Sequence, residues 1–304
     1  SGESLATLRG DQGWVRSCAF SPDGARLLSA GEDGSLRQWD AASGELLSTL
    51  RGDQGSVRSC AFSPDGARLL SAGEDGSLRQ RDAASGELLA TLCGHQGEVL
   101  FCAFSPDGAR LLSAGEDGSL RQWDAASGKL LSTLRGDQGG VRFGTFSPDG
   151  GCLLSAWDDG NLRLWDAASG ELLSTLYGHQ GEVLSCAFSA DGARLLSAGV
   201  DGTLRQWDAA SGKPLTTLRG HGGVVWSCTF SPDGTRVLSA GSDGSLRLWD
   251  AASGELLRVH ALLPDDSYAV WETREPRIVA AGGDAWRWLG WQVRDDDGQP
   301  TLLP

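Results

Sequence analysis

The chain has 304 residues, with 44 Gly, 12 Trp, 7 Cys and no Met, and its formal net charge is −14. An acidic chain is a poor ligand for nucleic-acid phosphates and anionic lipid surfaces, so neither partner is expected. The sequence has no run of roughly 20 apolar residues that would predict a transmembrane helix, and no secretory signal at its start. Because a natural chain begins with Met, its absence predicts that this segment comes from a longer protein.

A repeat of 42 residues organises the sequence and replaces the two domains of about 150 residues that length alone would predict. The tetrapeptide S-P-D-G, or S-A-D-G in one copy, starts at Ser21, Ser63, Ser105, Ser147, Ser189 and Ser231. The dipeptide W-D follows the same spacing at Trp39, Trp123, Trp165, Trp207 and Trp249, with Arg81 in the remaining copy. We therefore expect a single domain with six regular units over about 10–257.

Each unit contains four short strand signals separated by turns. In the first unit the signals cover 14–20, 25–30, 35–40 and 45–50, and Gly-containing turns lie between them. Four strands of about six residues joined in this way predict a small antiparallel sheet. Such a sheet cannot bury its apolar faces alone, so neighbouring units must stack.

These features resemble the WD-repeat family of β-propellers. The resemblance rests on the 42-residue period, the G-H near the start of several units, the S-P-D-G turn and the closing W-D, and it covers nearly the whole chain. The family implies an all-β, seven-bladed β-propeller whose blades are four-stranded antiparallel sheets. Highly repetitive arrays of this kind resemble those of bacterial multidomain proteins, in which the propeller serves as the sensing or scaffolding part.

A degenerate seventh blade is expected over about 258–304. Its strands are predicted at 267–272, 277–281 and 285–293, although its W-D is missing because Gln292 follows Trp291. Two segments compete for its outer strand: Ser1–Leu8, closing the ring from the N-terminus, and Gly298–Leu303, returning as a hairpin. We favour the N-terminal strand, because pairing the two termini would satisfy backbone groups at an open edge.

The resemblance also implies a buried hydrogen-bond network that joins the His of G-H, a Ser, a turn Asp and the Trp of W-D. In such a network the Trp N–H donates to the hydroxyl, the hydroxyl to His, and His to the carboxylate. The complete set occurs three times, as His95, Ser113, Asp117 and Trp123; His179, Ser197, Asp201 and Trp207; and His221, Ser239, Asp243 and Trp249. Because the set repeats blade after blade, we interpret it as packing and not as the catalytic group of a hydrolase.

Three units have Asp in place of this His, namely Asp11, Asp53 and Asp137. The same units carry Arg five residues later, whereas the His-containing units carry Leu or Trp there. Two interpretations stay open: each Asp turns outward to pair with its Arg, or the linked differences spread together when the units were copied. In the second unit, Arg81 replaces the anchoring Trp, which predicts that blade 2 is the least stable regular blade.

Five of the seven Cys occupy one position of the repeat: Cys18, Cys60, Cys102, Cys186 and Cys228. The total is odd and the spacing does not suit metal ligands, which argues against a disulfide framework and against zinc. We expect these five to be small buried apolar side chains near the propeller axis, in a reducing compartment.

The positions that differ between near-identical copies predict a binding face. In the resembling propellers, partners dock where the first strand begins and the turn between the second and third strands projects. The predicted partner-binding residues on this face are Trp14, Arg16, Arg58, Leu100, Arg142, Trp157, Leu184, Val200, Val224 and Trp226. Leu184, Val200, Val224 and Trp226 are expected to form an apolar patch, because exposed apolar groups rimmed by charge mark contact sites. Divergence by drift is the alternative explanation.

The sequence therefore predicts a monomeric, cytoplasmic protein-interaction scaffold or sensor within a larger signalling protein. Its partner would be another protein or another domain of the same chain, with no metal and no cofactor. We expect no enzymatic activity, because no nucleophile elbow or phosphate-binding Gly loop occurs. The alternatives are an enzyme with an active site in the axial channel, where the strands offer mainly Ser, Cys and Ala, and a purely structural spacer.

Overall fold

The structure is a computed structural model, and it describes residues 7–10, 13–51, 55–136, 139–263, 267–273, 277–282, 291–294 and 300–303, the last two ranges by their backbone. All of its regular secondary structure is β. Blade 1 consists of β1 (Val15–Phe20), β2 (Arg26–Gly31), β3 (Ser35–Asp40) and β4 (Leu46–Arg51), paired in that order as an antiparallel sheet. The predicted strand signals of the first unit match these four strands to within one residue.

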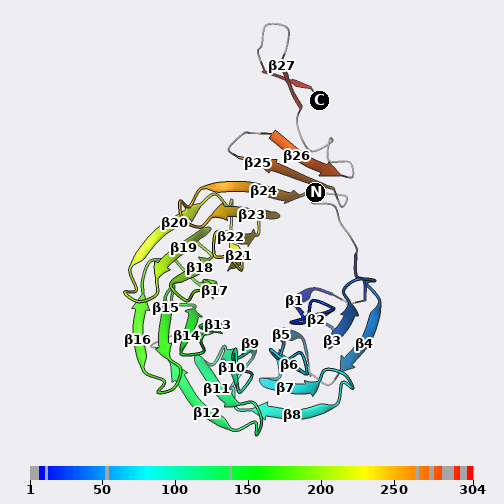
Figure 1. Ribbon diagram of the computed structural model, residues 1–304, viewed down its shortest axis with the longest axis vertical. Coiled ribbons are helices and arrows are strands. Elements are labelled where there is room, and N and C mark those ends of the chain that lie inside the picture. The colour runs from blue at the N-terminus through cyan, green and yellow to red at the C-terminus, as the bar shows by residue number, and fades with distance from the viewer. Residues whose placement is uncertain are drawn as a thin grey trace.

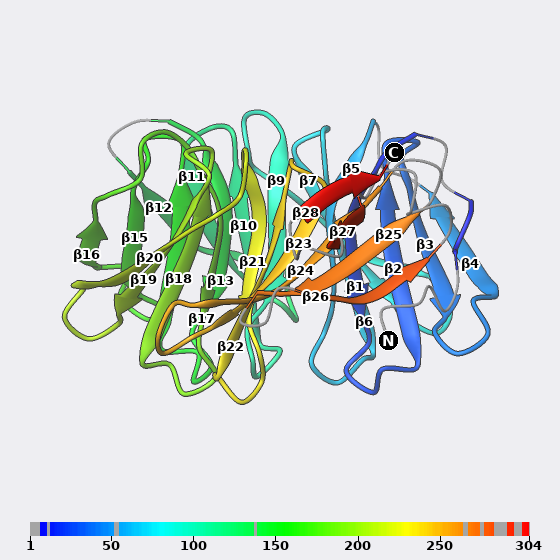
Figure 2. The same ribbon diagram turned by 90° about the horizontal axis from the view of Figure 1, so that it is seen from above.

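Five further blades follow around a central axis (Figures 1 and 2): blades 2 to 5 are four-stranded sheets, and blade 6 is part of a longer sheet. The strands of blades 2 and 3 are β5 (Val57–Phe62), β6 (Arg68–Gly73), β7 (Ser77–Asp82), β8 (Leu88–Cys93), β9 (Val99–Phe104), β10 (Arg110–Gly115), β11 (Ser119–Asp124) and β12 (Leu130–Arg135). Those of blades 4 and 5 are β13 (Val141–Phe146), β14 (Cys152–Trp157), β15 (Leu162–Asp166), β16 (Leu172–Leu176), β17 (Val183–Phe188), β18 (Arg194–Gly199), β19 (Thr203–Asp208) and β20 (Pro214–Arg219). Blade 6 has β21 (Val225–Phe230), β22 (Arg236–Gly241), β23 (Ser245–Asp250) and β24 (Leu256–Leu262).

The turns between strands satisfy their own polar groups. In the first S-P-D-G turn, the Ser21 hydroxyl donates to Asp23 at 2.5 Å and accepts the Arg26 N–H at 2.8 Å. Gly24 has a φ of 70°, which a residue with a Cβ adopts only at a cost. In the W-D turn, the Asp40 carboxylate accepts the Ser43 N–H at 2.7 Å. Because the same bonds recur in later units, the turns fix where each strand ends.

The hydrophobic core lies between blades. Between blades 2 and 3, for example, Leu70 and Leu78 pack against Leu111 and Trp123, and all four are buried. In four of the six blades, an arginine just after the S-P-D-G or S-A-D-G turn adds polar contacts to the next blade. Arg26 of blade 1 donates to the carbonyl oxygens of Ala83 and Gly66 in blade 2, both at 3.2 Å. We call this pair of hydrogen bonds the arginine latch.

The prediction of a seventh blade is wrong, because the propeller has six blades. The strands β25 (Tyr268–Glu272) and β26 (Arg277–Gly282) do exist where strands were predicted. However, β25 pairs antiparallel with β24, placing Val259 opposite Trp271, so these strands extend the sheet of blade 6 to six strands. Figure 1 shows β25 and β26 outside the ring, beyond β24. The physical reason is that 258–304 lacks both S-P-D-G and W-D-A, the two turns whose carbonyl oxygens accept the arginine latch.

Without a blade between blades 6 and 1, both end faces are exposed. Leu238 and Leu246 of blade 6 are 41% and 40% exposed, whereas their counterparts in the other blades are buried. On blade 1, Val15 and Phe20 are 55% and 65% exposed, and Cys18 is exposed as well. The prediction that Cys18 is buried fails for the same reason, because it expected a preceding blade.

Two segments were predicted as the outer strand at the end of the ring, and the structure describes only one of them as a strand. The segment β28 (Pro300–Leu303) pairs antiparallel with β27 (Trp291–Arg294), as the hairpin alternative expected. Residues 1–6 lie outside the described part of the chain, so closure by Ser1–Leu8 stays untested.

Blade 2 has the local defect that its sequence suggests. In blade 1 the Trp39 indole N–H donates to the Ser29 hydroxyl at 2.9 Å. In blade 2 the guanidinium of Arg81 bonds instead to the carbonyl oxygens of Arg51 and Gly86, at 2.9 and 3.2 Å. The buried hydroxyl of Ser71 consequently has no hydrogen-bond partner among the described residues.

Replacing Arg81 with Trp is expected to stabilise blade 2, because an indole N–H would give the Ser71 hydroxyl a donor. We expect a gain of about 1–3 kcal/mol in the free energy of unfolding, the usual cost of a buried unsatisfied polar group. Urea denaturation measures the gain, and slower amide hydrogen exchange in β5–β8 locates it. Trp39→Arg is the matched control and should weaken blade 1 instead. Unchanged exchange in β5–β8 of a folded Arg81→Trp variant would contradict this account.

Candidate functional site

The first strand of each blade lines the axis of the propeller. Together these strands surround a cavity of about 620 Å³. The residue after the first Val of each strand points into this cavity: Arg16, Arg58, Leu100, Arg142, Leu184 and Trp226. The sequence predicted all six for the binding face, and the structure brings them together. We call this end of the cavity the channel mouth.

The three arginines of the channel mouth are held by acidic side chains from two sources. Arg58 pairs with Glu74 in the turn of its own blade at 2.8 Å and with Glu98 of the next blade at 2.9 Å. Arg142 pairs likewise with Asp158 of its own blade and, at 3.3 Å, with Glu182 of the next. Arg16 pairs with Glu32. These ion pairs fix the direction of each guanidinium and link neighbouring blades.

The predicted pairing of these arginines with Asp11, Asp53 and Asp137 falls on residues outside the described part of the chain. In the described part, another arginine binds the turn carboxylate of the Asp-containing units. Arg37, Arg79 and Arg163 lie 2.7, 2.7 and 2.6 Å from Asp33, Asp75 and Asp159, respectively. A guanidinium on the third strand thus supplies the carboxylate with a cationic partner in these units.

The apolar part of the channel mouth is only partly the patch that was predicted. Leu184 and Trp226 line the cavity, and Trp226 is 56% exposed. Val200 and Val224 are not among the lining residues, and Val200 lies over Gly181 instead. Trp14 is also outside the cavity, 70% exposed, with the Arg16 guanidinium 4.9 Å from its ring centroid.

Trp157 does not belong to the exposed face, because its side chain is fully buried. Its indole N–H donates to the Ser155 hydroxyl at 2.7 Å, and the same oxygen accepts the N–H of Trp165 at 2.9 Å. Blade 4 has no network His, so the serine has a free position for a second donor. Trp157 takes that position, and the Arg163 guanidinium lies 4.5 Å from its ring centroid.

Two phenylalanines in the channel were missed by the sequence reasoning. In three blades a Ser at this position accepts the backbone N–H of the Cys in the next blade, as Ser59 does from Cys102 at 3.2 Å. Phe101 and Phe143 replace that Ser, and their ring centroids are 3.9 Å apart. Comparing the copies position by position along the first strand would have revealed both.

Comparison with known proteins bears directly on this architecture. The WD domain, G-beta repeat (WD40) profile matches six segments of the chain, 2–40, 44–82, 86–124, 128–166, 170–208 and 212–250. The chain belongs to the WD40 family. A search of curated proteins finds no match. The six WD40 segments end at residue 250, before the strands that were expected to form a seventh blade.

The three complete WD40 networks have the expected contacts. His95 has Nε2 at 2.7 Å from the Ser113 hydroxyl and Nδ1 at 3.0 Å from Asp117, and Trp123 donates to the same serine at 2.9 Å. His179 and His221 have the same contacts with their own Ser and Asp. Trp207 and Trp249 donate to Ser197 and Ser239 at 3.1 and 2.9 Å.

Each network also includes groups that the sequence reasoning left out. The Asp117 carboxylate accepts bonds from the Ser119 hydroxyl at 2.6 Å and the Gln96 N–H at 3.0 Å, and Arg121 lies 3.3 Å away. Burial opposes ionisation of Asp117, but the hydrogen bonds from Ser119, Gln96 and His95 outweigh it, so the pKa of this carboxyl is lowered. A fully bonded carboxylate of this kind positions the turn and is poorly suited to proton transfer.

The cysteines of the propeller form no disulfide, and the described residues form no metal site. All seven cysteines are free, and burial raises the pKa of Cys60 and Cys228 to about 12, so these thiols are protonated at neutral pH. No three His, Cys, Asp or Glu of the described residues converge as a metal site requires. None of the described segments forms a helix with the length and apolar character of a membrane span.

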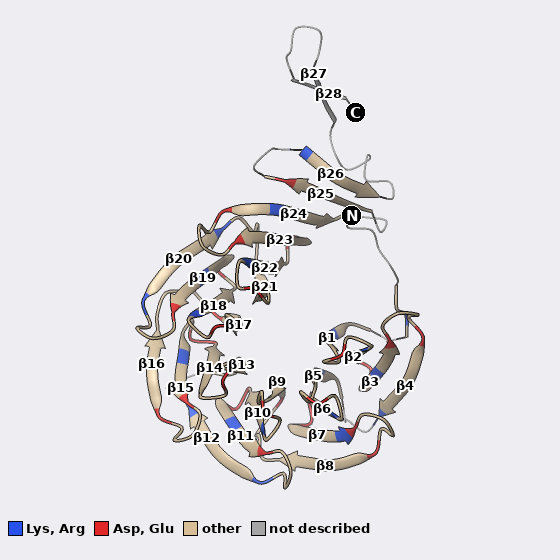
Figure 3. Ribbon diagram, in the orientation of Figure 1, with Lys and Arg blue, Asp and Glu red and all other residues tan. Residues whose placement is uncertain are grey.

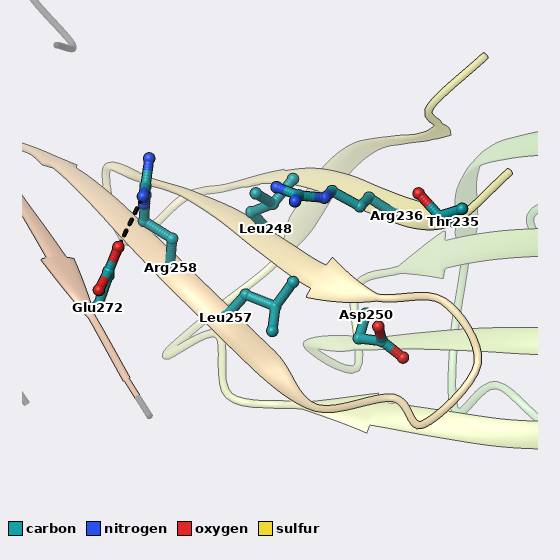
Figure 4. Close-up of a pocket in the computed structure, with 7 residues that line it drawn as sticks. All are labelled: Thr235, Arg236, Leu248, Asp250, Leu257, Arg258 and Glu272. Atoms are coloured by element: carbon teal, nitrogen blue, oxygen red, sulfur yellow. Dashed lines mark hydrogen bonds and ion pairs between the residues drawn. The ribbon is translucent and has the colours of Figure 1, made fainter. Parts of the chain in front are cut away.

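A second hollow, of about 430 Å³, lies on the end face of blade 6, where no further blade packs (Figure 4). In this view Arg236 extends alongside Leu248, and Arg258 of β24 pairs with Glu272 of β25 at 2.8 Å. Arg236 occupies the position of a latch arginine, but its exposed guanidinium forms no hydrogen bond with any described residue. The hollow therefore lies on the face of blade 6 against which a following blade would pack, and the latch arginine has no acceptor there among the described residues.

The folded protein is expected to lose stability as the pH falls below 6.5, the ordinary histidine pKa. Burial is the main reason that the pKa of His95, His179 and His221 is lowered, and the nearby Asp only partly offsets it. Below pH 6.5 the unfolded chain binds protons that the folded chain does not, so unfolding becomes easier. Each of these buried imidazoles contributes at most about 1.4 kcal/mol per pH unit.

Urea denaturation at pH 7.5 and pH 5.5 measures this dependence. His95→Gln, which cannot bind a proton, should show a smaller loss between the two pH values. If stability is the same at both, or if His95→Gln keeps the full loss, buried neutral histidines are not the cause.

Proposed function

We propose that this WD40 propeller is a protein-interaction module that binds a polypeptide at the channel mouth. The observation that carries the proposal is the clustering of Arg16, Arg58, Arg142, Leu184 and Trp226 around one cavity. Trp226 is 56% exposed although its side chain is large and apolar. Exposed Trp and Arg at the centre of a concave surface are typical binding hot spots.

The charges around the channel mouth favour a partner with basic residues. The channel mouth has three arginines but six acidic residues, which lie at the strand starts and in the turns: Glu32, Glu74, Glu98, Glu116, Asp158 and Glu182. The arginines are already paired with acids, so the surplus negative charge is available to a ligand. A polypeptide with one apolar anchor and a flanking Lys or Arg fits both features. Basic and acidic residues both occur along the blades (Figure 3), and the formal net charge of −14 disfavours nucleic acid as the partner.

The module hypothesis is better supported than an enzyme in the channel. The channel contributes Ser and Cys side chains, and the described bonds of Ser17, Ser59 and Ser185 are with the Cys of the next blade and not with a His, Asp or Glu that could act as a base. A nucleophile needs such a base or a lowered pKa, and burial raises the pKa of the channel cysteine Cys60 to about 12. A purely structural spacer would not account for the exposed, apolar side chain of Trp226 at the channel mouth.

The cellular setting remains part of the proposal. Seven free cysteines suit a reducing, cytoplasmic compartment. A monomeric propeller that binds a second domain or protein would serve as the sensing or scaffolding part of a larger signalling protein. Bacterial multidomain proteins provide the resemblance for this setting.

Selection of peptides from a random library on the purified propeller tests the function. Selected peptides are expected to share an aromatic or aliphatic residue next to Lys or Arg. Trp226→Ala and Leu184→Ala should each weaken their binding by about 10-fold or more, the loss expected of a hot spot. Leu173→Ala is the matched control, since Leu173 is 50% exposed on an outer strand. Failure to select any peptide, or equal losses for Leu173→Ala, would favour the spacer.

A further inference from the structure

The arginine latch recurs at four of the five interfaces between consecutive blades. Arg68 donates to Ala125 and Gly108 at 3.2 and 2.9 Å. Arg110 and Arg194 make the same two bonds to Ala and Gly carbonyl oxygens of the next blade, at 2.6–3.3 Å. Each latch guanidinium also lies over a Phe of the next blade, with its carbon 5.2–5.5 Å from the ring centroid. Two carbonyl oxygens and an aromatic face thus form a receptor for a guanidinium.

The interface between blades 4 and 5 retains this receptor but lacks the arginine. Cys152 occupies the latch position in blade 4, and Leu164 replaces the Gln that reaches the same Ala carbonyl in blades 1, 3 and 5. The acceptors on blade 5 are the carbonyl oxygens of Gly192 and Ala209, and neither accepts a hydrogen bond from a described residue. Ala209 is half-buried, whereas the alanines covered by a latch are 3% exposed.

A cavity of about 520 Å³ occupies the place of the missing arginine. Its wall includes Cys152, Leu164 and Phe188, together with Gly192 and Ala209. The cavity lies beside the S-P-D-G turns, at the opposite end of the strands from the channel mouth. Because Ala190, Asp191 and Ala210 on its rim are exposed, a ligand can enter from solvent.

The charge of the cavity wall suits a cation. Asp149 and Asp191 line it, and no Lys or Arg does. Each of these carboxylates is held in place by its own turn, since Asp149 accepts the Gly151 N–H at 3.0 Å and Asp191 the Ala193 N–H at 3.0 Å. A guanidinium is favoured over an ammonium because it is planar, stacks on a ring and donates to two separate acceptors at once.

We propose that this cavity between blades 4 and 5 binds the side chain of an arginine from a polypeptide partner. The ligand would donate to the carbonyl oxygens of Gly192 and Ala209 and stack on Phe188, as the chain's own arginines do in the neighbouring interfaces. This second site is separate from the channel mouth, and only the polypeptide nature of its ligand rests on the proposed function.

Titration of the whole propeller with small ligands, followed by amide NMR at Gly192 and Ala193, tests the proposal. Nα-acetyl-arginine amide should shift these resonances in the millimolar range. The capped citrulline has the same shape without the charge, and the capped lysine has the charge without the planar fork. Both should bind at least about 10-fold more weakly, because charge-assisted bidentate bonds are lost. Equal binding of citrulline would overturn the proposal.

Two variants locate the site. Cys152→Arg restores the latch, so it should abolish binding and raise the melting temperature by about 2 °C or more. Arg110→Cys combined with Gln122→Leu, which also removes the Gln122 bond to the Ala167 carbonyl oxygen, should create an equivalent cavity between blades 3 and 4 and raise the stoichiometry to two. Full binding by a folded Cys152→Arg protein would place the ligand elsewhere and refute this site. The Trp226→Ala variant should bind arginine as the unmodified protein does. A loss of peptide binding at the channel mouth can therefore be distinguished from a loss of arginine binding between blades 4 and 5.

The source of the guanidinium is tested separately. The tripeptide acetyl-Gly-Arg-Gly-amide should bind at least as tightly as N-butylguanidinium, which carries the same charge without a peptide backbone. A much tighter N-butylguanidinium would mean that the cavity excludes a polypeptide, and the proposed partner class would be wrong.

Discussion

The contact between one blade and the next is the constraint on which the whole molecule depends. A four-stranded sheet of this length has two faces to bury, and it can bury them only against its neighbours. Leucines of one blade pack on the Trp and Leu of the following blade, and the arginine latch adds hydrogen bonds and a Phe contact to the same interface. Because these residues sit at fixed positions of the repeat, copying one unit copies half of each interface that it forms.

This dependence explains why the array ends at six blades. The residues after 262 still form strands, but they carry neither of the turns that present carbonyl oxygens to a latch. The outer edge of β24 pairs with β25 instead, and β26 follows in the same sheet, since any extended segment can satisfy backbone hydrogen bonds at an open edge. The apolar residues on the two end faces are exposed as a direct consequence, and Leu238 and Val15 show it most clearly by contrast with their buried counterparts.

Much of the fold could be predicted because the turns are local. S-P-D-G and W-D-A-A-S-G form their own hydrogen bonds, so the strand ends follow from the sequence within a residue. The seventh blade could not be judged in this way, because a strand signal says nothing about the sheet that the strand will join. The prediction that Trp157 lies on the exposed face failed for a similar reason. Its burial depends on the Ser155 hydroxyl, which is available because this blade has no network His. The six residues of the channel mouth line one cavity because their shared position in the repeat decides where they point, whereas their role in binding stays a prediction.

Near-identity of the repeats also determines where specificity can arise. A face built from identical blades offers the same group at every step, and a ligand could then bind in any register. Single substitutions break that symmetry: Trp226 distinguishes blade 6 at the channel mouth, and Cys152 with Leu164 distinguishes blade 4 on the opposite face. The two kinds of change differ in cost. Trp226 adds a side chain to a surface, whereas the loss of the latch arginine removes two hydrogen bonds from an interface and leaves their acceptors unused. A half-buried receptor without its donor is destabilising unless another molecule supplies the donor, and a partner's arginine would recover part of the stability that blade 4 gave up.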